Sequence, residues 1–193
     1  MKVSIDELFS KLKYVRLAED TEIKPFDCEN KKLNTFIETE AKVLLKVLGY
    51  TTTLLEIEDK TVAYYSLAND LLISHDGKEL RRRFTGVKNK IHHELWELLL
   101  SQKHYPAVKI GRLAVHKDFQ RSGIGSFMLN SLTESFLVKN KTGCQFLTVD
   151  ALNTPCVTSF YKKNGFENLL ENTTGDTMPM CKSLLKYLYN KQV

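Results

Sequence analysis

The pattern of hydrophobic and polar positions changes sharply within one stretch, residues 108–136. Up to Val115 the stretch is largely apolar, interrupted by Lys109 and Arg112, which is typical of a buried β-strand. From Ile124 onward, apolar and small residues recur at intervals of three and four, the spacing of one face of an α-helix. The stretch therefore predicts a strand, a short loop and a helix, in that order.

The loop between this strand and helix is rich in small residues and contains one basic side chain. It runs Gln120, Arg121, Ser122, Gly123, Ile124, Gly125, Ser126. Glycine lets a ligand approach the backbone closely because no Cβ intervenes. The first N–H groups of a helix have no partner inside the helix, and the helix dipole places partial positive charge there. We therefore expect the N–H groups of residues 121–126 to bind an anion, most plausibly a phosphate group. The alternative is that these residues form an ordinary turn that binds no ligand.

The remaining pattern predicts strands and helices on both sides of this stretch. Residues 51–57 and 61–68 form a hairpin, and strands are expected at 14–17, 145–150 and 177–184. A helix at 155–163 starts at a proline and ends before Gly165. Another helix follows Asp27, a candidate cap, and its apolar positions are expected to share one buried face: Leu33, Phe36, Ile37, Val43, Leu44, Val47 and Leu48.

These elements define an α/β (α+β) fold with a mixed, mostly antiparallel central sheet flanked by helices. No internal repeat or linker divides the chain, so we expect one domain over residues 1–193 with an insertion at about 70–106. The insertion contains the run Arg81-Arg82-Arg83 and the pair Lys88 and Lys90, which are either a solvated surface or a contact for phosphate or RNA.

Composition narrows the class of protein further. The net charge of +5 favours anionic ligands only weakly, and a hydrophobic fraction of 42% is ordinary for a globular chain. The four cysteines are scattered without a CxxC pair, and the adjacent His92 and His93 point in different directions, so we expect neither a disulfide framework nor a metal. The first residues do not resemble a signal peptide, and no apolar run is long enough to cross a membrane. These features predict a reduced, cytoplasmic location.

The loop and its flanks resemble the GNAT superfamily of acetyl-CoA-dependent N-acetyltransferases. The family signature Gln/Arg-x-x-Gly-x-Gly/Ala is matched by Gln120, Gly123 and Gly125, and residues 159–166 are similar to the family's Phe-Tyr-x-x-x-Gly-Phe segment. The resemblance covers about residues 14–184. It implies the acyl-CoA N-acyltransferase fold, with acetyl-CoA as acyl donor and its pyrophosphate bound by residues 121–126.

The resemblance also assigns roles to particular residues. Leu113, Ala114 and Val115 correspond to the strand that runs beside the pantetheine arm, and Asn153 to a position near the pantetheine or adenosine side. Tyr161 corresponds to the family's general acid, which protonates the departing thiolate. A phenol has a pKa near ~10 and a thiol near ~8.5, so such a transfer is chemically feasible. No general base is evident: Asp118 and Asp150 are weak candidates, and proton loss through water is an equal alternative.

Three functions remain open on the sequence. The first is an N-acetyltransferase that moves an acetyl group from acetyl-CoA to a primary amine by direct attack. The second is narrower, because residues 26–30, 64–68, 111–115 and 149–151 resemble the toxin-like branch that acetylates the amino group of aminoacyl-tRNA and is held in check by an antitoxin protein. The third is a non-catalytic module that binds coenzyme A. The acceptor amine is unassigned, and a homodimer is compatible with the sequence.

Overall fold

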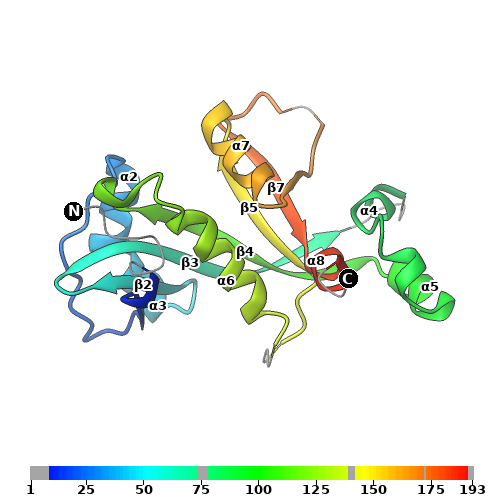
Figure 1. Ribbon diagram of the computed structural model, residues 1–193, viewed down its shortest axis with the longest axis horizontal. Coiled ribbons are helices and arrows are strands. Elements are labelled where there is room, and N and C mark those ends of the chain that lie inside the picture. The colour runs from blue at the N-terminus through cyan, green and yellow to red at the C-terminus, as the bar shows by residue number, and fades with distance from the viewer. Residues whose placement is uncertain (1–8, 74–77, 139–141, 172, 191–193) are drawn as a thin grey trace. The chain divides into compact units, whose positions relative to one another are not determined.

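The computed structural model describes residues 9–73, 78–138, 142–171 and 173–190, and contains one seven-stranded sheet (Figure 1). The strand order is β1-β2-β3-β4-β5-β7-β6. The strands are β1 (Lys13–Arg16), β2 (Thr51–Ile57), β3 (Lys60–Ile73), β4 (His104–Val115), β5 (Phe146–Leu152), β6 (Glu167–Asn168) and β7 (Thr177–Ser183). The pairs β1–β2, β2–β3, β5–β7 and β6–β7 are antiparallel, whereas β4–β5 is parallel. The expected mixed, mostly antiparallel sheet is confirmed.

Helices lie between the strands along the chain. They are α2 (Lys31–Thr35), α3 (Ala41–Lys46), α4 (Lys78–Arg83), α5 (His93–Ser101), α6 (Ile124–Ser135), α7 (Pro155–Lys163) and α8 (Leu184–Asn190). A π-helical turn, η1 (Phe36–Glu40), joins α2 to α3, and two 3-10 turns, η2 (Lys88–Lys90) and η3 (Lys117–Phe119), lie in loops. The helices α6 and α7 begin at Ile124 and Pro155, as predicted. The helix α8 was not predicted, because the sequence pattern extended the last strand through Leu184.

Contacts between residues group the chain into two compact units. The first comprises Met1–Ala68 and Ile110–Asn130, and the second comprises Asn69–Lys109 and Ser131–Val193. The strands β3 and β4 and the helix α6 each contribute residues to both units. A single domain with an insertion at 70–106 stays a prediction.

The first unit has two apolar clusters, one on α2–α3 and one beneath α6. The first cluster gathers Phe36, Ile37 and Tyr64, and the Tyr64 hydroxyl donates to the Leu33 carbonyl at 2.7 Å. In the second cluster, Ile124 and Met128 of α6 pack against residues of β2 and β3. At the start of α6, the face that the sequence predicted to be apolar is therefore buried.

The helical face predicted for residues 33–48 is only half correct. Phe36 and Ile37 are buried, but Val43 and Val47 are exposed and Leu48 is 91% exposed. The cause is the π-helical turn η1, which takes more residues per turn than an α-helix and so rotates every later side chain away from the expected face. The helix cap also differs from expectation: Asn30 accepts from the Leu33 N–H at 3.2 Å, and Asp27 is used elsewhere.

The second unit builds a core from segments that are far apart in the sequence. Phe84, Trp96 and Tyr105 from the 70–106 segment pack with Phe146 of β5 and Cys181 of β7. The Tyr105 hydroxyl donates to the Leu99 carbonyl at 2.8 Å, so this buried polar group is satisfied. The expected insertion thus supplies much of a core. In Figure 1, β5 and β7 lie side by side with α7 beside them.

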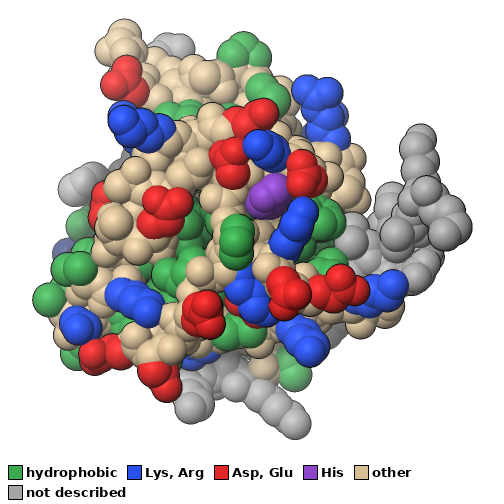
Figure 2. Space-filling view, turned by 90° about the vertical axis from the view of Figure 1, so that its left-hand side faces the viewer, with side chains coloured by type: hydrophobic (Ala, Val, Ile, Leu, Met, Phe, Trp, Pro, Cys, Tyr) green, Lys and Arg blue, Asp and Glu red, His purple; other side chains and the backbone are tan. Residues whose placement is uncertain are grey.

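Surface charge is mixed on the face of the molecule that Figure 2 presents. Basic and acidic side chains are interspersed there, and they leave apolar side chains visible between them. The positive net charge is therefore not gathered into one basic patch on that face.

The register change at η1 predicts a contrast between two apolar positions that the sequence placed on one face. Ile37→Ala removes a fully buried side chain and should lower the free energy of unfolding by about 2–4 kcal/mol. Val47→Ala removes an exposed side chain and should change it by less than about 0.5 kcal/mol. Urea denaturation of both variants measures this. Equal losses would contradict the register change.

Candidate active site

The loop after β4 presents a row of backbone N–H groups at the start of α6. The chain turns with positive φ at Arg121 (61°) and at Gly123 (90°) before the helix begins at Ile124. Among the described residues, the N–H groups of residues 121–126 donate no backbone hydrogen bond, and the N–H of Phe127 is the first to bond back, to the Gly123 carbonyl at 2.9 Å. These donors are open to a ligand, as an anion site requires.

Gly123 is the position in this loop where glycine itself is needed. Its φ of +90° lies in the region that residues with a Cβ rarely adopt. A Cβ at this position would meet only Phe9, at 3.9 Å, so conformation and not crowding imposes the glycine. The open space above the backbone allows close approach by a ligand.

Gln120 supports the loop and does not extend toward a ligand. Its side-chain amide donates to the Cys28 and Val115 carbonyls, both at 3.2 Å. The Ser122 hydroxyl donates to the Phe119 carbonyl at 2.5 Å. Both polar side chains of the signature are therefore directed at neighbouring backbone, which leaves the N–H groups as the ligand-facing part of the loop.

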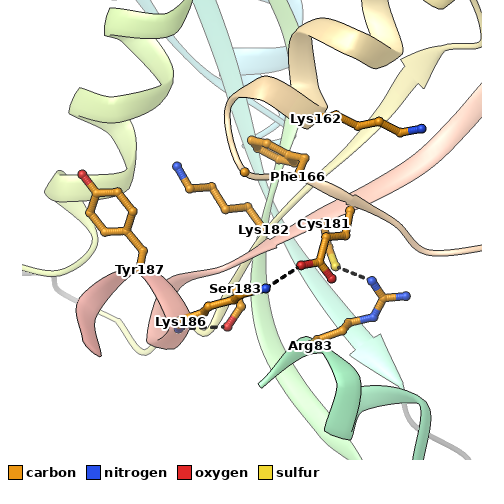
Figure 3. A pocket seen from close by; sticks show the side chains of 10 residues that line it. Arg83, Lys162, Phe166, Cys181, Lys182, Ser183, Lys186 and Tyr187 are labelled. Atoms are coloured by element: carbon orange, nitrogen blue, oxygen red, sulfur yellow. Dashed lines mark hydrogen bonds and ion pairs between the residues drawn. The ribbon is translucent and has the colours of Figure 1, made fainter. Parts of the chain in front are cut away.

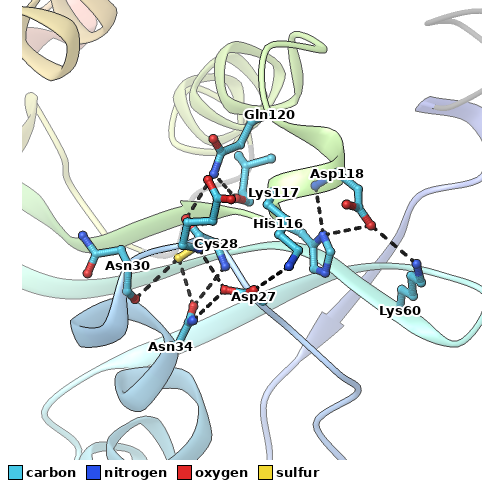
Figure 4. Close-up of polar contacts among 11 residues, drawn as sticks. Asp27, Cys28, Asn30, Asn34, Lys60, His116, Lys117, Asp118 and Gln120 are labelled. Atoms are coloured by element: carbon cyan, nitrogen blue, oxygen red, sulfur yellow. Dashed lines mark hydrogen bonds and ion pairs between the residues drawn. The ribbon is translucent and has the colours of Figure 1, made fainter.

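A polar network ties this loop to the segment before α2 (Figure 4). Asp27 forms an ion pair with Lys117 at 2.9 Å and accepts from the Glu29 N–H and from the Asn34 amide, also at 2.9 Å. The Lys117 N–H donates to the Asp27 carbonyl at 2.8 Å. The hydrogen bond from Lys117 holds the pKa of the Asp27 carboxyl far below its usual range, with further lowering by Glu29 and Asn34.

The same network continues through the residues of η3. The His116 Nδ1 accepts from the Asp118 N–H at 3.2 Å, and the Asp118 carboxylate lies 3.6 Å from the Lys60 ammonium. Sequence analysis did not find the roles of Asn34, His116 and Lys117. Asp27 stood out as a candidate helix cap and as part of a segment that resembles the toxin-like branch, and nothing in the spacing linked it to a lysine 90 residues away.

The strand segment Leu113, Ala114 and Val115 forms the end of β4, as expected. Ala114 is buried, and the Val115 carbonyl accepts from Gln120. Parallel pairing of β4 with β5 covers only Ala107–Lys109 and Phe146–Thr148 of the described strands. The backbone of β4 beyond Lys109 therefore has no β5 partner among the described residues, and its contact with a pantetheine arm stays a prediction.

Charged groups gather in the second unit where this parallel pairing ends. Lys109 of β4 forms an ion pair with Asp150 of β5 at 2.5 Å. The Thr148 hydroxyl donates to the Asp70 carboxylate of β3. Asp150 is thus engaged by a cation, and the general base stays unassigned.

Tyr161 lies in the second unit, near the end of α7, and is only 6% exposed. Its ring packs edge-on against Phe160 and Phe166, with centroids 5.2 Å apart in each case. Burial raises the pKa of the Tyr161 phenol well above its usual range, so the group is protonated at neutral pH. Among the described residues its hydroxyl makes no hydrogen bond, so the proton is not committed to a protein acceptor.

Asn153 precedes α7 in the same unit and is engaged by the loop before β7. Its N–H donates to the Asp176 carbonyl at 2.9 Å and its side-chain amide donates to the Gly175 carbonyl at 3.1 Å. The neighbouring Thr154 caps α7 by accepting from the Val157 N–H at 3.4 Å. These bonds give Asn153 a turn-forming role; its contact with a cofactor stays a prediction.

The predicted site residues thus fall into two groups, each described within its own unit. Residues 113–115 and 120–126 come together at the end of β4 and the start of α6, in the first unit. Tyr161 and Asn153 belong to the second. Within the described ranges no cluster of side chains suits a metal ion, and no helix is long and apolar enough to span a membrane.

Comparison with known proteins agrees with this geometry. Residues 84–168 match the acetyltransferase (GNAT) domain family, and this segment includes β4, the loop and α6. No curated protein sequence matches the chain. Residues 84–168 are therefore similar to a GNAT acetyltransferase domain, in agreement with the expected class of enzyme.

Solved structures share the fold at low sequence identity. A tyrosine-to-phenylalanine mutant of KacT is 20% identical with a TM-score of 0.68, covering 95% of this chain and 99% of that one. A mutant of the toxin AtaT bound to the C-terminus of the antitoxin AtaR and acetyl-CoA is 20% identical with a TM-score of 0.63, covering 93% and 98%. AtaT complexed with acetyl-methionyl-tRNAfMet is 21% identical with a TM-score of 0.61, covering 88% and 93%.

The Asp27–Lys117 ion pair predicts a specific response of stability to acid. Because the folded protein lowers the pKa of Asp27, the ion pair contributes stability above the unfolded pKa of about 4 and loses it as pH falls toward the folded value. Asp27→Asn should therefore lower the free energy of unfolding at neutral pH and flatten its decline below pH 4. Denaturation at a series of pH values measures both effects.

Asp20→Asn is the matched control, because Asp20 is an exposed aspartate for which the structure shows no partner among the described residues. It should leave both the stability and its pH dependence unchanged. If the two variants behaved alike, the ion pair would not be the anchor of the loop.

Proposed function

We propose that this protein is an N-acetyltransferase that takes the acetyl group of acetyl-CoA. The observation that carries the proposal is the row of open N–H groups at residues 121–126, which lies at the N-terminus of the 12-residue helix α6 and is shaped by the positive φ of Gly123. Amide donors and the helix dipole together favour a pyrophosphate. The Arg121 guanidinium adds a cation beside the same loop.

The chain holds the donor through backbone groups on two elements. Residues 121–126 bind the pyrophosphate, and the edge of β4 that has no β5 partner beyond Lys109 bonds the pantetheine arm near Leu113. Acetyl-CoA supplies an activated thioester carbonyl to this site. With the donor fixed at two places, catalysis comes chiefly from positioning the carbonyl against an incoming amine.

Tyr161 is proposed as the general acid. As the amine nitrogen bonds to the acetyl carbon and the carbon–sulfur bond breaks, the departing thiolate takes the phenol proton, and the amine releases a proton to water. The phenol carries its proton at neutral pH and donates it to the thiolate as the thiolate forms. Solvent then restores the phenol proton, so the products are the acetylated amine and the free thiol.

We infer that the acceptor is the amino group of an aminoacyl-tRNA. The support is the likeness in fold to AtaT, which has been solved with acetyl-methionyl-tRNAfMet, together with the resemblance of residues 26–30 and 64–68 to the toxin-like branch. On this proposal, an antitoxin protein is a second partner, as AtaR is for AtaT. A free small-molecule or peptide amine is the alternative acceptor, and a non-catalytic module is disfavoured by the uncommitted phenol of Tyr161.

Removing the Tyr161 hydroxyl should slow the reaction and spare donor binding. Tyr161→Phe keeps the buried ring and its contacts with Phe160 and Phe166, so the protein should fold normally. We expect kcat to fall by about 10²–10⁴-fold with a nearly unchanged dissociation constant for acetyl-CoA. Thiol release with a panel of amines and aminoacyl-tRNAs measures the rate, and calorimetry measures binding. An unchanged rate would remove the acid role.

Gly123→Ala should produce the opposite pattern. The Cβ disfavours the φ of +90° that sets the row of N–H groups, so affinity for acetyl-CoA should fall by about tenfold or more. The rate at saturating donor should be largely retained, because Tyr161 is untouched. Gly143→Ala, in the loop before β5, is the control and should bind acetyl-CoA normally, because a Cβ there would meet only Pro106, at 4.0 Å. Unaltered binding by the Gly123 variant would contradict the phosphate site.

A further inference from the structure

A basic pocket lies in the second unit and is used by none of the chemistry above (Figure 3). It has a volume of about 400 Å³, large enough for one nucleotide-sized group. Four cationic side chains line it, each from a different element: Arg83 of α4, Lys162 of α7, Lys182 of β7 and Lys186 of α8. Glu167 is the one acidic residue in the lining, so the pocket carries an excess of positive charge.

Two of these cations are built into the pocket wall. Arg83 and Lys182 are each only 5% exposed. Arg83 donates to the Cys181 sulfur at 3.3 Å and to the Asn168 and Leu169 carbonyls at 3.0 and 3.2 Å, which are neutral acceptors. The Lys182 ammonium lies 4.7 Å from the centre of the Tyr187 ring. Both cations are therefore held in fixed positions at the wall of the pocket.

The third cation is held by the acidic group of the pocket. Lys186 pairs with Glu167 at 2.8 Å, and both side chains are partly exposed. Lys186 and Arg83 line the same pocket, as Figure 3 shows. A phosphate entering the pocket would therefore meet a lysine whose present partner is weak in water, and could replace the carboxylate.

The pocket is next to the proposed general acid. Phe166 lines the pocket, and its ring packs edge-on against Tyr161 with centroids 5.2 Å apart. Lys162 follows Tyr161 directly in α7. Any ligand in the pocket is thus separated from Tyr161 by one aromatic ring, which places it near the reacting end of an acceptor and not at a remote surface.

We propose that this pocket binds a phosphate group of the RNA acceptor. The inference rests on the proposed function, since it takes the acceptor to be an aminoacyl-tRNA. Phosphate contacts from lysine and arginine supply much of the affinity of proteins for nucleic acids and fix the register of the chain without reading its sequence. The interspersed charges of the face in Figure 2 offer no comparable gathering of cations.

Two substitutions that break the same ion pair should have opposite effects on RNA binding. Lys186→Gln removes a cation and leaves Glu167 facing the ligand, so affinity for deacylated tRNA should fall by about tenfold and the salt slope should shrink by about one. Glu167→Gln removes the competing carboxylate and frees Lys186, so affinity should rise. A purely structural role for the pair would make both variants lose affinity together.

Lys163→Gln is the control for net charge. It removes one exposed cation from the same helix end as Lys162, outside the pocket, and should leave tRNA binding nearly unchanged. Fluorescence titration of each full-length variant at several salt concentrations gives the affinities, with thermal unfolding to verify folding. If the wild-type protein acetylates aminoacyl-tRNA but all three variants bind tRNA alike, the pocket is not the phosphate site and the proposed function stands. If the wild-type protein neither binds tRNA nor acetylates aminoacyl-tRNA, the proposed function and this inference both fail.

Discussion

The unsatisfied N–H groups at the start of α6 are the constraint on which the rest of the candidate site depends. A helix cannot satisfy its first amide donors internally, so water, a side chain or a ligand must do so. In this protein no side chain of the loop turns back to cap them: the Gln120 amide and the Ser122 hydroxyl bind carbonyls instead. The loop has the chemistry of a receptor for an anion, and its shape has to be held from outside.

The shape is held by side chains that come from distant parts of the sequence. Asp27 reaches Lys117 across 90 residues, and Gln120 reaches the Cys28 carbonyl across 92. On the other side, Ile124 and Met128 fix the helix start in an apolar cluster with β2 and β3. Hydrogen bonds and an ion pair therefore hold one end of this short loop, and apolar packing holds the other end. This arrangement explains how a loop with two positive φ angles can keep a single conformation before a ligand binds.

The features that the sequence predicted well are those whose signals are local. Pro155 and the Asn164-Gly165 ending bound α7 correctly, and the change of period at Ile124 located the start of α6, because caps and periodicity depend on neighbouring residues. The failures have non-local causes. The turn η1 changes which side chains of α3 are buried, and its sequence contains no glycine or proline that would have indicated it. The role of Lys117 depends on its pairing with Asp27, which only the fold brings about. The burial of Arg83 was equally hidden, since an arginine run usually marks a solvated surface.

The position of the cations bears on which acceptor this enzyme uses. A net charge of +5 would hardly distinguish an RNA-binding protein from any other protein, because the 28 basic side chains are offset by 23 acidic ones. What distinguishes the second unit is that four elements separated in sequence each bring a cation to one pocket, and that two of these cations are nearly fully buried. A small neutral amine gains little from such a pocket, and a cationic amine would be repelled by it. An acceptor that carries phosphate beside its amine would gain both affinity and orientation from four cations at one pocket, and this is the physical basis of the proposed RNA acceptor.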